Sequence, residues 1–500
     1  ALNESHFPSK TTCLEELAKK ETPPLQRLIF EELFLLEVGV RWKRQQHRTV
    51  PGIPFAIDLN IREAIKKILP FHPTSSQKKA FGELVSDMRQ SIPMNRLLQG
   101  DVGCGKTIVA MEAIAIAVEN GYQVGLMAPT EILAEQHFFY ANQLYTKINY
   151  RIALLKSGLR KKERVFLLEQ LRKGQIQILI GTHALLQSDV EFKNLGLVII
   201  DEQHRFGVLQ RFNLMRKGTY PDTLVMTATP IPRTLSMTLY GDLDVSVIDE
   251  MPPNRTPIET RLLEETERIY AYKFIAEQVQ KGHQVYFLCP LIEESEKLDL
   301  KAATITFEHL KNEIFPMFKV ELLHGRLKSH EKDAIMHRFS CGETSILVTT
   351  TVIEVGVDVA NATVMFIEHA ERFGLAQLHQ LRGRVGRGQN KSYCFLMQGS
   401  KTVTPEANQR LSCLESTTNG FEIAEKDLEI RGPGEFFGTR QAGLPTLRVS
   451  NLLRDQKILL KARKEAIYFV DNNSNRSNLR NLVNCLNSKW KKRYGLIGVG

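Results

Sequence analysis

The chain has 500 residues, of which 43% are hydrophobic and 24% are charged, so it is long enough for two or more domains with separate cores. No apolar run is long enough to cross a bilayer, which excludes a transmembrane segment, and no secretory signal opens the chain. A formal net charge of +10 indicates a polyanionic partner such as nucleic acid, although such a charge also serves solubility alone.

Cysteine usage indicates a reducing compartment. The seven cysteines are scattered and contain no C-x-x-C pair, which disfavours both a disulfide framework and a metal site. We therefore expect a cytoplasmic protein. The cysteines are Cys13, Cys104, Cys289, Cys341, Cys394, Cys413 and Cys485.

Residues 1–50 have the pattern of a helix. Apolar residues recur at helical spacing from Leu25 to Leu36, ahead of the basic cluster Arg41-Trp42-Lys43-Arg44. A solvated helix end explains this cluster as well as DNA contact does, and we favour the first interpretation. Because the chain begins with Ala1 inside a polar stretch rather than with Met, we expect the natural N-terminus to lie farther upstream.

Phe71, Thr74 and Gln77 precede the first large motif at the distance where nucleotide-dependent motors place an adenine reader. A Gln amide offers both a donor and an acceptor to one face of adenine. Gln77 could also simply open a surface helix, but its position favours nucleotide contact by Phe71 and Gln77.

The stretch Gly100–Thr107 has the spacing G-x-x-x-x-G-K-T of a phosphate-binding loop. A short apolar run precedes it, and a helical pattern from Ile108 to Val118 follows, which is the strand–loop–helix context that the motif requires. A Gly-rich turn beside an ordinary Lys is the weaker alternative.

The residues of this loop suit a magnesium nucleotide. Its glycines let backbone N–H groups turn towards a polyphosphate at the helix N-terminus. These glycines are Gly100, Gly103 and Gly105. Lys106 would reach the terminal phosphates of ATP, and the Thr107 hydroxyl would bind Mg²⁺.

From residue 122 onward, short apolar runs alternate with amphipathic helices, the pattern of a parallel sheet covered on both faces. Strands at 124–128 and 176–180 end in the loops of Thr130 and Thr182. Because ligands bind at the carboxyl ends of such strands, we expect these two threonines to contact the sugar-phosphate backbone of DNA.

A third apolar strand, 197–200, delivers Asp201 and Glu202. One carboxylate at a strand end can hold Mg²⁺ through water, and the next can orient and deprotonate the attacking water. We assign Asp201 to the metal and Glu202 to the water. Acidic pairs often follow apolar strands by chance. When such a pair follows a phosphate loop in the same domain, it usually serves metal binding and water activation.

A linker-like composition around residues 249–257 separates a second alternating set of strands, at 285–288, 320–323, 346–348, 364–367 and 393–396. This second α/β domain has no phosphate loop. It carries instead the arginine-rich stretch Gln380–Arg387, which we interpret as arginine fingers for a γ-phosphate held by the first domain rather than as a general DNA patch. The catalytic candidates in this stretch are Gln380, Arg384 and Arg387. Three further candidates follow a strand end: Thr350 for DNA, and Gly356 and Asp358 for the nucleotide ribose.

Taken together, these motifs resemble helicase superfamily 2 and, within it, the RecG family of DNA helicases. The resemblance covers nearly the whole chain and is narrowest in the block from Arg431 to Gly443, which is similar to the translocation motif of that family. From the residues alone this block predicts a Gly-rich surface loop. The resemblance implies roles in DNA translocation for Arg431, Arg440 and Gln441.

The resemblance also implies an architecture, an α/β fold of two tandem RecA-like domains. We expect a helical linker at 1–50 that follows a missing wedge domain, an ATP-binding domain at 51–250, a second helicase domain at 251–410 and a helical translocation segment at 411–500. Cys104 stands where the family usually has a small Ser, a change that we expect to be mild.

The implied function is ATP-dependent, Mg²⁺-dependent remodelling of stalled forks and Holliday-type junctions, with translocation of the 3′–5′ type. The implied setting is the bacterial nucleoid, with a monomeric protein and a single-strand-binding protein as a possible partner. A transcription-repair coupling factor and a two-domain motor that does not act on nucleic acid stay open as alternatives. An RNA helicase is disfavoured because Gln203-His204 replaces the Ala-Asp that follows Asp-Glu in the commonest RNA-acting group.

Overall fold

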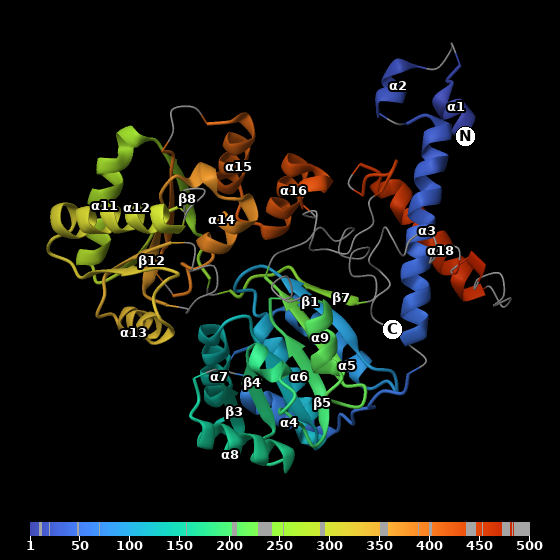
Figure 1. Ribbon diagram of the computed structural model, residues 1–500, viewed down its shortest axis with the longest axis horizontal. Coiled ribbons are helices and arrows are strands. Elements are labelled where there is room, and N and C mark those ends of the chain that lie inside the picture. Colours follow the sequence, from blue (N-terminus) through green and yellow to red (C-terminus); the bar gives the residue numbers. More distant parts are fainter. Residues whose placement is uncertain are drawn as a thin grey trace.

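The computed structural model consists of two α/β lobes and a helical arm (Figure 1). Lobe 1 is built on one seven-stranded sheet and lobe 2 on one six-stranded sheet. The arm pairs an N-terminal with a C-terminal helix. The structure describes residues 1–9, 13–19, 21–47, 50–69, 71–156, 158–202, 208–228, 243–253, 255–290, 296–350, 359–388, 390–399, 403–436, 447–452, 454–472, 481–482 and 484.

The N-terminal region is helical, as its periodicity predicts. It contains α1 (Leu2–His6), α2 (Leu14–Lys19) and the long α3 (Pro23–His47). One face of α3 packs against α18 (Gln456–Asn472), burying Ile29 and Leu33 against Leu459. The arm therefore joins segments that are more than 400 residues apart in the sequence.

The basic cluster near the end of α3 forms ion pairs within the chain. Arg41 donates to both carboxylate oxygens of Asp471 on α18, at 3.0 and 2.7 Å. Arg44 pairs with Asp244 of lobe 1. Both arginines thus fasten the arm through ion pairs, instead of forming the solvated helix end that we favoured from the sequence.

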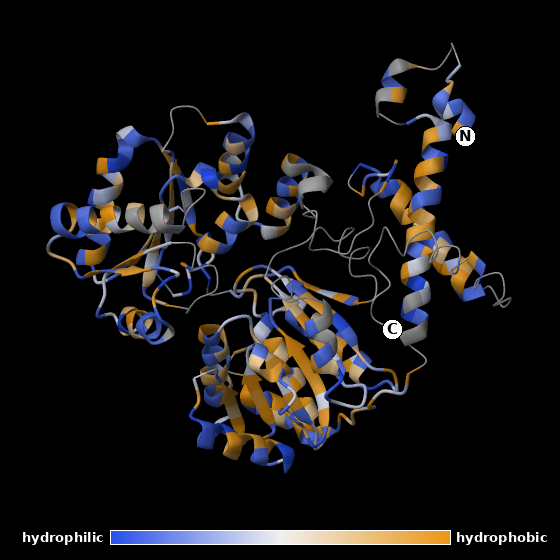
Figure 2. Ribbon diagram, in the orientation of Figure 1, coloured by the Kyte–Doolittle hydropathy of each residue, from blue (hydrophilic) through white to orange (hydrophobic). Residues whose placement is uncertain are grey.

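Every paired strand of lobe 1 is parallel to its neighbour, in the order β3-β4-β2-β5-β6-β1-β7. Helix α6 is apolar on all sides because the sheet covers one side and α4 and α5 cover the other. Figure 2 shows the strands of this lobe as a hydrophobic centre enclosed by helices with hydrophilic outer faces. The strands are β1 (Asn95–Gly100), β2 (Gln123–Met127), β3 (Ile152–Leu155), β4 (Ile178–Gly181), β5 (Leu195–Ile200), β6 (Asp222–Thr227) and β7 (Asp244–Ile248), and the helices are α4 (Leu59–Ile68), α5 (Ser75–Met88), α6 (Lys106–Glu119), α7 (Glu131–Tyr145), α8 (Lys161–Arg172), η1 (His183–Leu186) and α9 (Val208–Met215).

Lobe 2 has the strand order β10-β11-β9-β12-β13-β8, again with parallel pairing. Aromatic rings fill much of its core, among them Phe287 and Phe366, which stack with ring centroids 4.5 Å apart. The strands are β8 (Glu259–Leu263), β9 (Gln284–Leu288), β10 (Val320–Leu323), β11 (Ile346–Thr349), β12 (Ala362–Ile367) and β13 (Tyr393–Met397), and the helical segments are η3 (Glu265–Glu267), α11 (Arg268–Gln280), α12 (Glu296–His309), η4 (Leu310–Ile314), α13 (Ser329–Ser340), η6 (Ala370–Arg372) and α14 (Leu375–Arg382).

The chain then forms α15 (Pro405–Ser416) and α16 (Gly420–Phe436), which pack on lobe 2 and add Leu411, Leu414 and Ile423 to its core. We expected a Gly-rich loop from Arg431 onward, but α16 continues through Gly432-Pro433-Gly434 to Phe436. Contacts with α14 and α15 hold this helix. Among the described residues, no helix is long and apolar enough to cross a membrane.

Strands β3, β7 and β8 were not predicted from the sequence, and each lies at the edge of its sheet. Edge strands are exposed along one side, so polar residues interrupt the apolar runs of β7 and β8, whereas β3 is a short run of four apolar residues. The sequences Asp244–Ile248 and Glu259–Leu263 show this mixture.

Candidate nucleotide site between the two lobes

The phosphate loop connects the end of β1 to the start of α6. Gly105 has φ +93° and lies directly before the first residue of α6, a conformation that favours glycine. Lys106 is buried, and its Nζ donates to the carbonyl oxygens of Gly100 and Asp101, at 2.9 Å each. The lysine is therefore held at the loop, with Thr107 next to it at the helix N-terminus.

The other two glycines of the loop lie against neighbouring groups of the chain. A Cβ on Gly100 would lie 2.5 Å from Sγ of Cys104, so close packing requires glycine there. Gly103 has φ +79°, and the guanidinium group of Arg255 occupies the space beside it. We assigned Gly103 to the phosphates, whereas the structure places a cation of the linker at this point, because Arg255 donates to the carbonyl of Val102. Phosphate contact by Gly103 therefore requires Arg255 to move aside.

Asp201 directly follows β5 and is buried. Burial opposes its ionisation, but a hydrogen bond from His137 at 2.8 Å and the charge of Lys106 outweigh burial and lower its pKa. Because Nε2 of His137 bonds a carboxylate, this nitrogen carries the proton. His137, on α7, is a residue that the sequence analysis missed, and it orients the carboxylate assigned to the metal.

Glu202 has a strained backbone, with φ +53° in the left-handed region. One of its carboxylate oxygens accepts from the N–H of Ala228, at 3.3 Å. Burial and the neighbouring charge of Asp201 raise its pKa, whereas the charges of Lys106 and Arg384 lower it. The side chain is thus a partly buried acid with a raised pKa, and the charges that lower this pKa come from one cation of each lobe.

The residues assigned to Mg²⁺ fit a hard cation. An ionised carboxylate on Asp201 and a hydroxyl on Thr107 are oxygen donors of the kind that Mg²⁺ prefers, and both lie beside the phosphate loop. Among the described residues, no cluster of three or more His, Cys, Asp or Glu side chains could hold a metal by itself. A site completed by phosphate oxygens and water agrees with both observations.

Gln77 touches the phosphate loop directly. Its Nε2 donates to the carbonyl of Cys104 at 2.8 Å, and its Oε1 accepts from the N–H of Thr74 at 2.9 Å in a capping box on α5. The second N–H of the amide can still donate to a base. Phe71 lies four residues before α5 and is 46% exposed, as a stacking surface would be.

Lobe 2 presents its arginine-rich stretch through the C-terminal end of α14. Gln380 is buried in this helix, and Arg384 lies just after the helix ends. The charge of Arg384 acts on Glu202 and lowers its pKa. Arg387 donates its Nε to the carbonyl of Gly383 at 3.3 Å, a contact within its own loop. The structure therefore brings the charge of Arg384 to the site, whereas this contact of Arg387 is local.

Arg382, in the same stretch, was not among the catalytic candidates. It is buried and donates to the carbonyls of Leu414 and Thr417, at 2.7 and 2.9 Å. Its role is therefore structural.

The three threonines among the candidate DNA residues follow the carboxyl ends of strands. Thr130 caps α7 after β2, and Thr182 precedes η1 after β4, so the two belong to loops on adjacent strands of lobe 1. Thr350 follows β11 in lobe 2 and is buried. Arg431 lies in α16. Its side chain, together with Gly356, Asp358, Arg440 and Gln441, lies outside the described residues.

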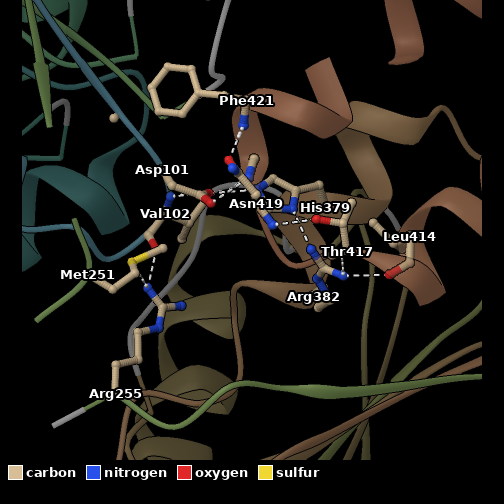
Figure 3. Close-up of polar contacts among 12 residues, drawn as sticks. Asp101, Val102, Met251, Arg255, His379, Arg382, Leu414, Thr417, Asn419 and Phe421 are labelled. Atoms are coloured by element: carbon tan, nitrogen blue, oxygen red, sulfur yellow. Dashed lines mark hydrogen bonds and ion pairs between the residues drawn. The ribbon is translucent and has the colours of Figure 1, made fainter. Parts of the chain in front are cut away.

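Polar contacts between the lobes converge on the start of the phosphate loop (Figure 3). Asp101 accepts from His379 on α14, and Arg255 of the linker donates to the carbonyl of Val102. A cavity of about 330 Å³ adjoins them, lined by both lobes and by the linker. No sequence motif predicts a role for Asp101, Arg255 or His379 in contact between the lobes.

Comparison with known proteins gives three family matches along the chain. Residues 74–238 match the DEAD/DEAH box helicase model, residues 266–389 match the helicase conserved C-terminal domain, and residues 417–492 match the model of domain 3, C-terminal, of the ATP-dependent DNA helicase RecG. The ATP-dependent DNA helicase RecG of Bacillus subtilis is 47% identical over 473 residues, which are 94% of this chain and 68% of that protein. The chain belongs to the RecG family.

Two further comparisons, with a RecG sequence and a RecG structure, show how much of each protein the similarity covers. RecG of Synechocystis is 50% identical over 93% of this chain and 55% of its own length. A structure of RecG bound to a three-way DNA junction superimposes with a TM-score of 0.72 at 48% identity, covering 87% of this chain and 57% of that one. The chain therefore spans roughly half to two thirds of the length of these RecG relatives. The two parallel-sheet lobes are the RecA-like pair of that family.

Proposed function

We propose that this chain is the motor part of an ATP-dependent DNA helicase that remodels branched DNA. The observation that carries the proposal is that lobe 2 contacts the loop that holds Lys106: Asp101 of this loop accepts from His379, on the helix that leads into Arg384. A site divided between two lobes is active only when they close, which is how hydrolysis can drive motion along DNA.

In this mechanism the backbone N–H groups of the phosphate loop and Lys106 hold the ATP phosphates. Mg²⁺, bound through Thr107 and Asp201, would supply charge neutralisation at the phosphate chain. Glu202 accepts a proton from the attacking water, for which its raised pKa suits it. Arg384 neutralises charge that develops on the γ-phosphate, with Gln380 and Arg387 as supporting residues. Gln77 and Phe71 would contact the adenine.

DNA would lie across both lobes, held through its phosphates by the loops of Thr130, Thr182 and Thr350. Such contacts carry little sequence preference. Support for a branched substrate comes from the RecG relatives and from the RecG structure that contains a three-way junction. We further propose the four-part division of the chain given above, a monomeric state, a site of action on the bacterial chromosome in the cytoplasm, and a single-strand-binding protein as a partner.

The test is ATPase activity with no DNA, with linear duplex and with a model fork. We expect DNA to stimulate hydrolysis, and Glu202→Gln to lower kcat by about 100-fold or more while ATP binding stays intact, because only the proton acceptor is lost. Glu169→Gln, on the exposed face of α8, is the matched control. ATPase activity that no DNA stimulates would overturn the proposal.

A further inference from the structure

The second residue of the phosphate loop is an aspartate, which is an unexpected choice beside a polyphosphate. An anionic side chain near the phosphates of ATP would repel them unless it were turned away and paired. Asp101 is buried and its pKa is lowered: burial opposes ionisation, but contacts with His379 outweigh it. Its carboxylate thus serves a partner other than the nucleotide.

Both oxygens of Asp101 bind groups that follow the linker. Oδ1 accepts from Nε2 of His379 at 2.5 Å, and Oδ2 accepts from the backbone N–H of Gly420 at 3.0 Å (Figure 3). His379 lies on α14 and Gly420 is the first residue of α16. One side chain of lobe 1 therefore fastens two helices from the other side of the cleft.

The histidine is itself fixed by a second contact. Its Nδ1 accepts from Arg382 at 2.9 Å, so the ring is the neutral tautomer with its proton on Nε2, directed at Asp101. Arg382 also donates to the carbonyls of Leu414 and Thr417, which ties the end of α15 to the same group. The contact at Asp101 is thus backed by a connected set of buried hydrogen bonds.

Packing next to this contact leaves little space. A Cβ placed on Gly383 would lie 2.9 Å from side-chain atoms of Val102, and one on Gly420 would lie 2.6 Å from the Asp101 carboxylate. The backbone of lobe 2 therefore approaches the phosphate loop as closely as glycine permits. This close packing defines one position of α14 against the phosphate loop.

We propose that Asp101 is a positioning residue that seats α14 on the phosphate loop and thereby places Arg384 against the nucleotide. The inference rests on the proposed function. Asp101 precedes Lys106 by five residues on one lobe, and His379 precedes Arg384 by five on the other, so the contact sets the separation of the two cations. A displacement of catalytic groups by about 1 Å can lower a rate by about 100-fold.

The experiment compares Asp101→Asn, His379→Asn and the double variant. We expect each single change to lower kcat for DNA-stimulated ATP hydrolysis by about 10- to 100-fold. Affinity for a fluorescent ADP analogue should change by less than about threefold, since the loop N–H groups and Lys106 stay in place. The double variant should be no worse than the poorer single variant, because both remove one contact.

Asp189→Asn is the matched control, since it makes the same change in an exposed aspartate of lobe 1 that pairs with Arg164. Small-angle X-ray scattering with a nonhydrolysable ATP analogue reports the seating of the lobes without turnover. We expect a larger radius of gyration for Asp101→Asn than for the wild type or the control. Should Asp101→Asn fail to fold, His379→Asn tests the same contact from lobe 2.

Three results would overturn the proposal: kcat equal to that of the control, loss of nucleotide affinity with kcat unchanged, or additive effects in the double variant. A wild-type chain without DNA-stimulated ATPase activity would instead refute the proposed function. The scattering comparison would still decide whether Asp101 seats lobe 2.

Discussion

Individual buried acids in this molecule differ in what surrounds them. Asp101 and Asp201 are held ionised by histidines, whereas Glu112 lies in the apolar helix α6 and is only 4% exposed. Burial raises the pKa of Glu112 to about 8. A position that carries a carboxyl among Ala, Ile and Val side chains therefore destabilises lobe 1 at neutral pH.

We predict that Glu112→Met stabilises the protein, and more so as pH rises. Near pH 4.5 the carboxyl is protonated in the folded chain and half protonated in the unfolded chain, so the gain is small. Between about pH 4.5 and pH 8 the Glu112 carboxyl is ionised in the unfolded chain but keeps its proton in the folded chain. The free energy of unfolding that Glu112 costs the protein therefore increases over this range. The upper limit of the gain is about 5 kcal/mol. Chemical denaturation at pH 5 and pH 8.5 measures it, with Glu63→Met on the exposed face of α4 as control. Equal gains at both pH values would contradict the prediction.

Among the elements, α3 is joined to the C-terminal region by a charged side chain as well as by its apolar face. Glu32 accepts from the backbone N–H groups of Arg448, Val449 and Ser450, at 2.7, 3.1 and 2.9 Å. Burial opposes ionisation of Glu32, but these hydrogen bonds outweigh it and lower its pKa. The charge therefore fixes the turn that leads into α18 against the N-terminal helix.

We predict that Glu32→Gln loosens this turn at neutral pH. The loss of a charged acceptor should lower the free energy of local opening of this turn by about 1 to 2 kcal/mol. The backbone amides of residues 448–450 should therefore exchange their hydrogens faster. Because the folded pKa lies below the unfolded one, the contribution is present above about pH 4.5 and is lost as pH falls through the folded pKa. Glu31→Gln, the exposed neighbour that faces Arg27, is the control. Unchanged exchange at residues 448–450 would count against this role.

At the scale of the whole molecule, the two lobes repeat one plan. Ignoring β7, their strand orders correspond one to one, so β5 matches β12 and β1 matches β8. Arg268 begins α11 as Lys106 begins α6, and His369 after β12 has φ +50° where Glu202 after β5 has φ +53°. In lobe 2, however, Arg268 bonds to the carboxylates of Glu265 and Glu368. Carboxylates of the chain thus occupy the place that phosphates would take in lobe 1.

We predict that the chain binds one nucleotide, in lobe 1. Isothermal titration with a nonhydrolysable ATP analogue should give a stoichiometry of about one, abolished by Lys106→Ala. Arg268→Gln should leave nucleotide affinity unchanged but lower the melting temperature, because it leaves Glu368 buried without its cation. A second bound nucleotide, or loss of affinity in Arg268→Gln, would show that lobe 2 is a site.

Much of this architecture follows from local pattern. The buried strands of both sheets read as apolar runs because helices cover both faces of a parallel sheet. The cations and carboxylates assigned to the nucleotide each follow a motif with its own spacing. The hydrogen-bond partners of these residues follow no such motif, because they lie far away in the sequence. His137 lies 64 residues from Asp201, and His379 lies 278 residues from Asp101. For the same reason, no local pattern predicts that Arg255 lies beside Gly103.

The sequence by itself therefore determined the phosphate loop, the acidic pair, the arginine-rich stretch and the alternation that makes two parallel-sheet lobes. These depend on neighbours along the chain, where spacing alone sets which side chains share a face or a loop. Only the tertiary structure decided that Asp101 turns to His379, that α16 runs through its glycines and proline, and that Arg41 and Arg44 fasten the arm. Those outcomes depend on contacts between distant segments, whose free energy exceeds local preference and leaves no periodic trace in the sequence.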